Sequence, residues 1–555
     1  MPLLALTFLI LLVSNKLFAQ NVQWIARYDG PANYGDKAIA IELDKLGNIY
    51  VTGYSYNSAT AYDYTTIKYN SFGDTIWTAR YNGPDNYYDV PTAMVLDDSG
   101  NVYVTGWSEN TIPYDDDIAT VKYNSDGVMQ WVNRYDYPDI LSDERANAIA
   151  IDDSGNVYVT GYIYPSGSWS DYLTIKYNPA GDTLWTARYN GPMDASDAAN
   201  AIAVDGLGNV YVTGNSFGTS SKDYTTIKYN SNGQTIWVAR YNSPQDWVEE
   251  ARAMAVDKSG NVYVTGRSYN DSVTQMDYLT VKFDSSGVLE WVSRYPNTHS
   301  SLFDANDIVL DDSNYVYITG YSSNYTTIKY SLSGDTIWVA SYQDSIHFLG
   351  VGNALAVDTS GNVYITGFTL GPGSSNDYST VKYSSLGDFQ WVAYYNGPSN
   401  KVDIATDIAV DESGNVYVTG YSVDAISSAD YLTIKYVQGP VASMQDDLSV
   451  PVSFSLSQNY PNPFNPTTKI KFTIPQSPLL GGDGRGGFVT LIVYDVLGKE
   501  ISTLVNEEKP AGNYEVEFNG EGLTSGIYFY QLRVGDPESS SGQGFIETKK
   551  MVLLR

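Results

Sequence analysis

Carboxylates and aromatic rings are the side chains of this chain best suited to chemistry, because most other catalytic groups are scarce. The sequence contains no cysteine and only two histidines, His299 and His347. Disulfides, thiolate catalysis and cysteine-ligated zinc are therefore excluded, and histidine metal sites or Ser-His triads are disfavoured. The 63 Asp and Glu residues favour cation binding or, as pairs, glycoside hydrolysis.

The densest group of carboxylates is the tandem Asp115, Asp116 and Asp117. Three adjacent carboxylates repel one another unless water or a cation screens them. We therefore expect a candidate Ca²⁺ site here. The spacing is not that of an EF-hand, and a solvated acidic loop tip would have the same sequence.

Aromatic residues recur in the variable parts of the chain. A flat ring beside a carboxylate suits a sugar, through stacking and hydroxyl hydrogen bonds, although the same rings could simply pack between neighbouring loops. Three tryptophans interrupt an otherwise regular Trp pattern, and six aromatic residues follow a repeated Val/Ile-Thr-Gly. The candidate ligand-binding residues are Tyr54, Trp107, Tyr162, Trp169, Trp247, Tyr321, Phe368 and Tyr421.

The elements that must position these residues are copies of one unit. Tryptophan recurs every 47–54 residues, at Trp24, Trp77, Trp131, Trp185, Trp237, Trp291, Trp338 and Trp391. The segment GNVYVTG, with small variations, recurs at the same interval. A period of this length indicates a solenoid, a propeller or another repeat array.

One unit, residues 147–189, contains four short β-type segments separated by turns, which predicts a four-stranded antiparallel meander. The repeats do not begin and end at the same point of the unit. The chain begins with a Trp strand, and its last repeat ends with a TIKY-type strand that has no Trp strand after it. Pairing of these two ends would close a ring and protect its edges. We therefore predict an all-β fold in which residues 20–436 form an eight-bladed β-propeller closed by the N-terminal strand.

The two ends of such a meander differ in what they offer a ligand. Tight turns (DxSGN and NSxGD) share one face, and the long variable loops share the other. The turn Asp and the Lys of TIKY recur in every copy and are best explained by the scaffold. The formal net charge of −31 makes the long loops acidic and disfavours nucleic acid as a partner.

The units SGNVYVTG and DYxTIKYN resemble the secreted bacterial SBBP β-propeller family over residues 21–436. The resemblance implies a fold and no particular activity. The Gly-x-x-x-Trp spacing is also similar to the tryptophan-docking repeat of pyrroloquinoline-quinone dehydrogenases. Those enzymes add a vicinal disulfide that this chain cannot form, so we interpret the motif as blade packing.

Both ends of the chain indicate export. Residues 1–19 read as a signal peptide, and no other segment is apolar enough to span a membrane in the mature chain. After a linker at 437–452, residues 453–555 resemble the type A sorting domain of the type IX secretion system, through NYPNPFNPTTKIKFTIP and GIYFYQL. The resemblance implies passage through that machinery, with release or surface attachment, and a small Ig/Fn3-like β-sandwich.

We therefore expect a secreted or cell-surface binding protein that recognises a glycan or a surface protein through an acidic-aromatic loop face. Two alternatives stay open: an extracellular carbohydrate-active enzyme that uses loop carboxylates, and a structural surface-layer protein. A pocket with several Asp residues of perturbed pKa would favour the enzyme. Loops without an organised concavity would favour the surface layer.

Overall fold

The computed structural model describes residues 20–554 except 33, 111–115, 138–141, 166–168, 270–274, 297–302, 322–323, 344–347, 372–374, 425–427, 439–454, 475–486, 510–511 and 535–544. The chain divides into two compact units, Met1–Ala442 and Ser443–Arg555. Every helix or strand assigned in the described residues is a strand, so this part of the chain has no helix that could cross a bilayer.

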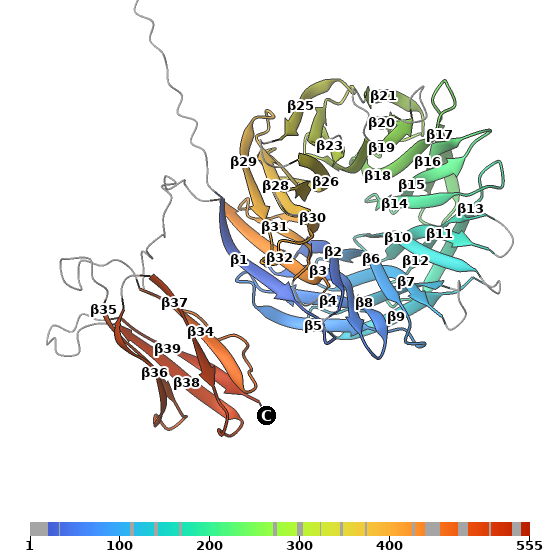
Figure 1. The fold of residues 1–555 in the computed structure, drawn as a ribbon. Helices are drawn as coiled ribbons and strands as arrows, with labels where there is room; N and C mark the ends of the chain where they lie inside the picture. The colour runs from blue at the N-terminus through green and yellow to red at the C-terminus, as the bar shows by residue number, and fades with distance from the viewer. Residues whose placement is uncertain are drawn as a thin grey trace, which may run out of the picture. The chain divides into compact units, whose positions relative to one another are not determined.

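The first unit is a β-propeller of antiparallel meanders set around a common centre (Figure 1). The first meander pairs β2 (Asp36–Leu43), β3 (Ile49–Asn57), β4 (Ala61–Tyr69) and β5 (Thr75–Tyr81) in that order. The unit has six four-stranded sheets. One eight-stranded sheet joins two further meanders through the single pair Tyr321 and Val351.

The remaining strands follow the same order within each meander. The innermost strands are β6 (Asp89–Leu96), β10 (Asp143–Ile151), β14 (Ala198–Val204), β18 (Glu249–Val256), β22 (Asp304–Leu310), β26 (Phe348–Val357) and β30 (Asp403–Val410). The second strands are β7 (Val102–Glu109), β11 (Val157–Tyr164), β15 (Val210–Phe217), β19 (Val262–Tyr269), β23 (Val316–Tyr321), β27 (Val363–Leu370) and β31 (Val416–Ser422). The third strands are β8 (Asp116–Tyr123), β12 (Asp171–Tyr177), β16 (Lys222–Tyr229), β20 (Met276–Phe283), β24 (Tyr325–Tyr330), β28 (Asp377–Tyr383) and β32 (Asp430–Gln438). The outer strands are β9 (Met129–Tyr135), β13 (Thr183–Tyr189), β17 (Thr235–Tyr241), β21 (Leu289–Tyr295), β25 (Thr336–Tyr342), β29 (Phe389–Tyr395) and β1 (Gln20–Tyr28).

The two ends of the propeller meet in one sheet, as the phase of the repeats predicts. β1 is the outer strand of the sheet β1-β32-β31-β30, and its register runs from Gln20 opposite Gln438 to Tyr28 opposite Tyr431. This pairing covers the edge that β32 would otherwise expose. It places the first described residues of the chain beside the end of the last repeat.

The repeated tryptophans dock each sheet onto the next. The indole Nε1 of Trp185 donates to the Ser231 carbonyl at 3.0 Å, and a Cβ on Gly233, whose φ is +79°, would lie 2.6 Å from the Trp185 ring. The same donation recurs at Trp24, Trp77, Trp131, Trp237, Trp291 and Trp338. The Gly-x-x-x-Trp spacing thus serves packing between sheets, as we interpreted it. In the sixth copy, Asn314 has φ +62° and replaces the turn glycine, as the left-handed turn requires.

Buried polar contacts also cross the junctions. The hydroxyl of Tyr64 donates to the Ala119 carbonyl, and the hydroxyl of Tyr431 donates to the Thr65 carbonyl across the closure. Six of the repeated lysines donate to a turn carbonyl of the next sheet, as Lys68 does to Ser125, and Lys68 lies over the Tyr50 ring of its own sheet. Lys68 is also 3.9 Å from Asp44. The residues copied in every repeat are therefore occupied in holding the ring together.

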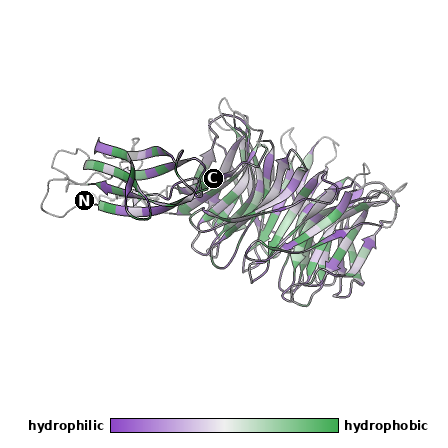
Figure 2. Cartoon of the chain, turned by 90° about the horizontal axis from the view of Figure 1, so that it is seen from below, coloured by the Kyte–Doolittle hydropathy of each residue, from purple (hydrophilic) through white to green (hydrophobic). Residues whose placement is uncertain are grey.

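The second unit contains two sheets around one core. One sheet has β33 (Ser455–Leu456), β34 (Thr467–Ile474) and β37 (Gly512–Asn519), and the other has β36 (Glu500–Lys509), β35 (Gly487–Tyr494), β38 (Gly526–Val534) and β39 (Phe545–Leu553). Apolar and polar residues alternate along these strands (Figure 2). Ile470 and Phe472 of the first sheet share a buried cluster with Leu491 and Leu532 of the second.

Candidate functional site

Buried carboxylates hold the long loops of the propeller in place. Asp36 accepts hydrogen bonds from the backbone amides of Gly30 and Tyr56, at 2.5 and 3.0 Å. Asp89 corresponds to it in the next repeat and binds the Gly83 amide at 2.7 Å. Burial raises the pKa of Asp89 to about 6, although these hydrogen bonds oppose the rise. A raised pKa on this face thus occurs in a carboxylate that holds the backbone of a long loop in place.

A second set of carboxylates, at the start of the third strands, is paired with arginines of the outer strands. Arg80 lies 3.1 Å from Asp63, and the same pair recurs in further repeats. The other pairs are Arg134–Asp117, Arg188–Asp171, Arg240–Asp223, Arg294–Asp277 and, with β1, Arg27–Asp430. Each of these ion pairs neutralises one carboxylate near the long-loop face.

The long-loop end of the first meander carries a connected group of rings, which we name the tyrosine cluster: Tyr34, Tyr54, Tyr56, Tyr62 and Tyr88. Ring centroids lie 4.7 Å apart for Tyr34 and Tyr56, 5.3 Å for Tyr56 and Tyr62, 5.0 Å for Tyr54 and Tyr62, and 5.6 Å for Tyr62 and Tyr88. Tyr34 is 55% exposed and Tyr88 43% exposed. The cluster is therefore exposed at Tyr34 and Tyr88 and half-buried between them.

Strand register brings the cluster together. Tyr56 on β3 pairs directly with Tyr62 on β4, and the loops before β2 and β6 supply Tyr34 and Tyr88. In the second repeat the corresponding pair is Glu109 and Asp116. In the fourth repeat it is Phe217 and Lys222. The paired tyrosines distinguish the first repeat from these copies. A binding surface on a scaffold of repeats requires such a difference between one repeat and the others.

Two of the sequence-predicted ligand residues lie at or beside this cluster. Tyr54 belongs to it, and burial raises the pKa of Tyr54 to about 12, with Tyr62 and Tyr421 adding to the rise. Tyr421 lies at the junction between the last and first repeats, where the Lys37 ammonium is 4.4 Å from its ring centroid. Lys37 is the strand partner of Tyr54.

The other predicted residues after Val/Ile-Thr-Gly are half-buried at two further junctions, Trp107 and Tyr162 at one and Tyr321 and Phe368 at the other. The Arg145 guanidinium covers the Trp107 ring at 4.5 Å, and Arg145 is also the strand partner of Tyr162. Tyr321 pairs with Val351 of the following meander, and Phe368 lies on β27. Trp107 therefore has one face occupied by a cation of its own chain.

The remaining predicted tryptophans differ in exposure. Trp169 is 58% exposed, just before β12. Trp247 is half-buried, with the Arg294 guanidinium 5.7 Å from its ring. The structure places neither of them in the tyrosine cluster.

The acidic tandem is divided between two ion pairs. Asp115 lies outside the described residues, Asp116 is 2.6 Å from Arg145, and Asp117 is 2.6 Å from Arg134. Burial raises the pKa of Asp116 to about 7, and Arg145 opposes the rise. Successive residues of a strand point to opposite faces, so Asp116 and Asp117 contact different neighbours. The Ca²⁺ site at this tandem stays a prediction.

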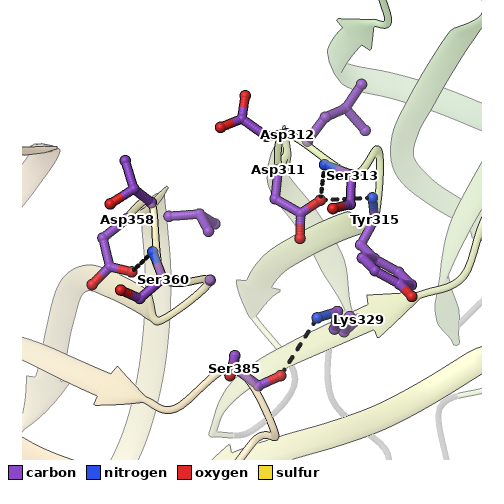
Figure 3. Close-up of a pocket in the computed structure, with 12 residues that line it drawn as sticks. Asp311, Asp312, Ser313, Tyr315, Lys329, Asp358, Ser360 and Ser385 are labelled. Carbon is purple, nitrogen blue, oxygen red and sulfur yellow. Dashed lines mark hydrogen bonds between the residues drawn. The ribbon is translucent and has the colours of Figure 1, made fainter.

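The tight-turn face contains hollows between neighbouring repeats. One, of about 310 Å³, lies between the turns at Asp311 and Asp358, with Lys329 and Ser385 in its wall (Figure 3). A second, of about 390 Å³, lies at the corresponding turns of Asp152 and Asp205. The Asp311 carboxylate accepts hydrogen bonds from the amides of Ser313 and Tyr315, so it is committed to its own turn.

Sequence reasoning missed four members of the tyrosine cluster: Tyr34, Tyr56, Tyr62 and Tyr88. A signal was present, because tyrosine is unusually dense in YSYNSATAYDY (54–64) and NYYD (86–89). This signal is hard to recognise, because every repeat also uses tyrosines for packing. Only the pairing of β3 with β4 distinguishes the tyrosines of the cluster from the packing tyrosines.

The families that match the chain agree with this architecture. Residues 185–220, 236–272 and 390–423 match the SBBP β-propeller repeat, and residues 458–543 match the secretion system C-terminal sorting domain. The protein thus combines a propeller of SBBP repeats with a type IX sorting domain. The sorting domain implies engagement with the type IX secretion machinery, and secretion or attachment at the cell surface.

Individual relatives are distant. An uncharacterised WD repeat-containing protein, L264 of Acanthamoeba polyphaga mimivirus, is 23% identical over 52% of this chain and 23% of its own length. The regulatory protein FlaEY of Caulobacter vibrioides is 31% identical over 18% of this chain and 12% of its own length. The chain therefore spans less than a quarter of either relative.

Two solved structures with similar folds resemble this chain only distantly. Sqt1 of Chaetomium thermophilum has a TM-score of 0.46 and 11% identity, over 76% of this chain and all of that one. PorZ, a surface component of the type IX secretion system of Porphyromonas gingivalis, has a TM-score of 0.33 and 13% identity, over 93% of this chain and 74% of that one.

Proposed function

We propose that this protein is a secreted or surface-attached, non-enzymatic propeller that binds an extracellular glycan through the tyrosine cluster. The observation that carries the proposal is the connected set of rings at Tyr34, Tyr56, Tyr62 and Tyr88, which is exposed at Tyr34 and Tyr88. Aromatic faces stack on the apolar faces of sugar rings while their hydroxyls form hydrogen bonds. Tyrosine loses little side-chain entropy on binding, which favours it in recognition surfaces.

The proposal includes the architecture that presents this surface. Residues 20–436 form eight blades closed by β1, a signal peptide at 1–19 is removed, and 437–452 link the propeller to an Ig/Fn3-like sandwich at 453–555. The repeated strand pattern and the β1–β32 pairing support the blade count. Two packed sheets with one shared core support the sandwich.

A carbohydrate-active enzyme is the less supported alternative. Asp36, Asp89 and Asp197 accept hydrogen bonds from loop amides, and Asp63 is paired with Arg80. A glycosidase needs two carboxylates facing the same scissile bond. The roles of these groups in the fold compete with that use.

The experiment is a glycan array probed with the purified chain and with the variants Tyr34→Ala and Tyr88→Ala. Both residues lie at the exposed ends of the cluster, so their loss should weaken binding roughly tenfold, equivalent to about 1.4 kcal/mol, without unfolding the propeller. Tyr164→Ala is the matched control, because Tyr164 is 41% exposed on β11, the strand that corresponds to β3.

A glycan signal that survives both cluster variants would overturn the tyrosine cluster as the site. Trp107→Ala and Trp169→Ala would then test the other predicted aromatic residues. Silence across the array would contradict the glycan ligand and shift the assignment to a protein partner or a structural coat.

A further inference from the structure

One group of carboxylates differs from the anchors and ion pairs described above. Carboxylate oxygens of Asp117, Asp136 and Glu144 all lie within 4.8 Å of one another, at the junction between the second and third repeats. Glu144 is fully buried, Asp117 is 5% exposed, and Asp136 is exposed, so solvent reaches the group through Asp136. Arg134, paired with Asp117, is the cation that contacts the group.

Glu144 is unusual because neither of its oxygens has a hydrogen-bond partner of normal geometry in the described part of the chain. Burial raises the pKa of Glu144 to about 8, and the charges of Asp117 and Asp136 add to this rise, while Ser142 and the Tyr137 amide oppose it. A buried carboxylate whose oxygens lack well-formed hydrogen bonds is costly unless it is protonated or binds a cation.

At another junction, three carboxylates in the same arrangement do have hydrogen-bond or ion-pair partners. Asp29, Asp36 and Asp430 occupy the corresponding positions where β1 meets the first repeat, also within 4.8 Å. There, Asp36 binds two backbone amides and Asp430 pairs with Arg27. Glu144 occupies the position of Asp36, but neither of its oxygens has a hydrogen bond of comparable geometry in the described residues.

The third carboxylate also departs from the ordinary repeat. Asp136 follows the outer strand at a position where other repeats have an asparagine whose amide donates to a loop side chain four residues later. These asparagines are Asn82, Asn190, Asn242 and Asn396. Asparagine at this position is therefore compatible with the fold, and Asp136 adds a negative charge where Glu144 is already buried.

We propose that Asp117, Asp136 and Glu144 form a site for a divalent cation, best matched by Ca²⁺. Hard carboxylate oxygens are the ligands that Ca²⁺ prefers, and water entering beside Asp136 can complete the coordination. The cation satisfies the Glu144 oxygens and offsets the repulsion among the three carboxylates. Extracellular modules bind Ca²⁺ with dissociation constants of about 10⁻⁴–10⁻³ M, a range that suits an exported protein.

The test is Ca²⁺ titration of the purified chain by calorimetry at about 150 mM salt, which screens diffuse binding to an acidic surface. Asp136→Asn converts the position to the residue of the ordinary repeat and should weaken one Ca²⁺ site at least tenfold. Asp29→Asn makes the same change at the other junction. Glu249→Gln removes a corresponding buried carboxylate that neighbours Asn242, and neither control should change that site.

A second readout keeps the proposal testable if a variant is less stable. Ca²⁺ should raise the melting temperature of the unmodified chain and of both controls, and this rise should be lost in Asp136→Asn. The proposal is overturned if no stoichiometric site is present or if Asp136→Asn binds as the unmodified chain does. Loss in Asp29→Asn alone would also overturn it, by placing the cation at the other junction.

Discussion

At the scale of single residues, each repeated side chain has a contact that explains why it is copied. Trp185 rests on Gly233 of the next turn, and Lys68 reaches the Ser125 carbonyl across a junction. The residues that vary between repeats differ in how far solvent reaches them. Tyr34 and Tyr88 are exposed, whereas Trp107 is covered by Arg145.

Close docking of tryptophan onto glycine predicts a graded series of glycine variants. Gly233→Ala combines left-handed strain of about 1–2 kcal/mol with a clash against Trp185. Gly47→Ala has a φ of +77° and nothing within 4 Å, so it measures the strain alone, and Gly206→Ala has neither. The melting temperature should be unchanged in Gly206→Ala, lower in Gly47→Ala and lowest in Gly233→Ala. Equal effects of Gly233→Ala and Gly47→Ala would contradict the docking.

The buried Glu249 predicts a pH dependence of stability. Burial raises its pKa from 4.5 to about 7, although the hydroxyls of Ser243 and Ser268 oppose the rise. The folded state therefore keeps its proton where the unfolded state has lost it. This contribution to the free energy of unfolding is full below about pH 4.5 and is lost as the pH rises through about 7.

Glu249→Gln should accordingly reduce the loss of stability between pH 5 and 8 by an amount on the order of 3 kcal/mol. Urea unfolding followed by tryptophan fluorescence measures this in the first unit, because all 11 tryptophans lie between residues 24 and 391. Glu412→Gln, at an exposed position, is the control. An unchanged pH profile in Glu249→Gln would refute the assignment.

At the scale of elements, the ring depends on a strand far from its partner in sequence. β1 pairs with β32 over eight registered positions, and Trp24 of β1 donates to the Ser71 carbonyl of the first repeat. One strand thus completes the last sheet and docks it onto the first.

Deletion of residues 1–28, compared with deletion of 1–19, should therefore lower the melting temperature by roughly 10 °C or more and promote self-association through the exposed edge of β32. Differential scanning fluorimetry and size-exclusion chromatography measure the two effects. A synthetic peptide of residues 20–28 should restore both properties in part. A monomer of unchanged stability without β1 would show that closure contributes little.

At the scale of the whole molecule, the sorting domain and the propeller are separate compact units. The core of the second unit, including Ile470, Phe472, Leu491 and Met551, belongs to that unit alone. The sorting match at 458–543 falls entirely within it. Each unit therefore has a buried core of its own.

Deletion of residues 443–555 should leave the melting temperature of the propeller unchanged but abolish its appearance outside the cell. Fractionation of a host with a type IX secretion system, with and without the tail, measures the second effect. Continued export of the truncated chain would show that the sorting domain is not required for export.

The repeats and the order of strands could be predicted from the sequence because both depend on local patterns. The 47–54-residue period marks each meander, and the unpaired Trp strand at the start identifies the partner of β32. The left-handed turn at Asn314 could be predicted as well, because few residues other than glycine and asparagine adopt it readily.

The surroundings of individual loop residues were decided only by tertiary structure. Asp116 and Asp117 are adjacent in the chain, yet they pair with Arg145 and Arg134 on different strands. Tyr56 and Tyr62 meet through strand register, and the buried Glu144 lacks the well-formed hydrogen bonds that Asp36 accepts. These outcomes depend on contacts between separate strands and loops, whose geometry the local sequence of a repeat does not encode.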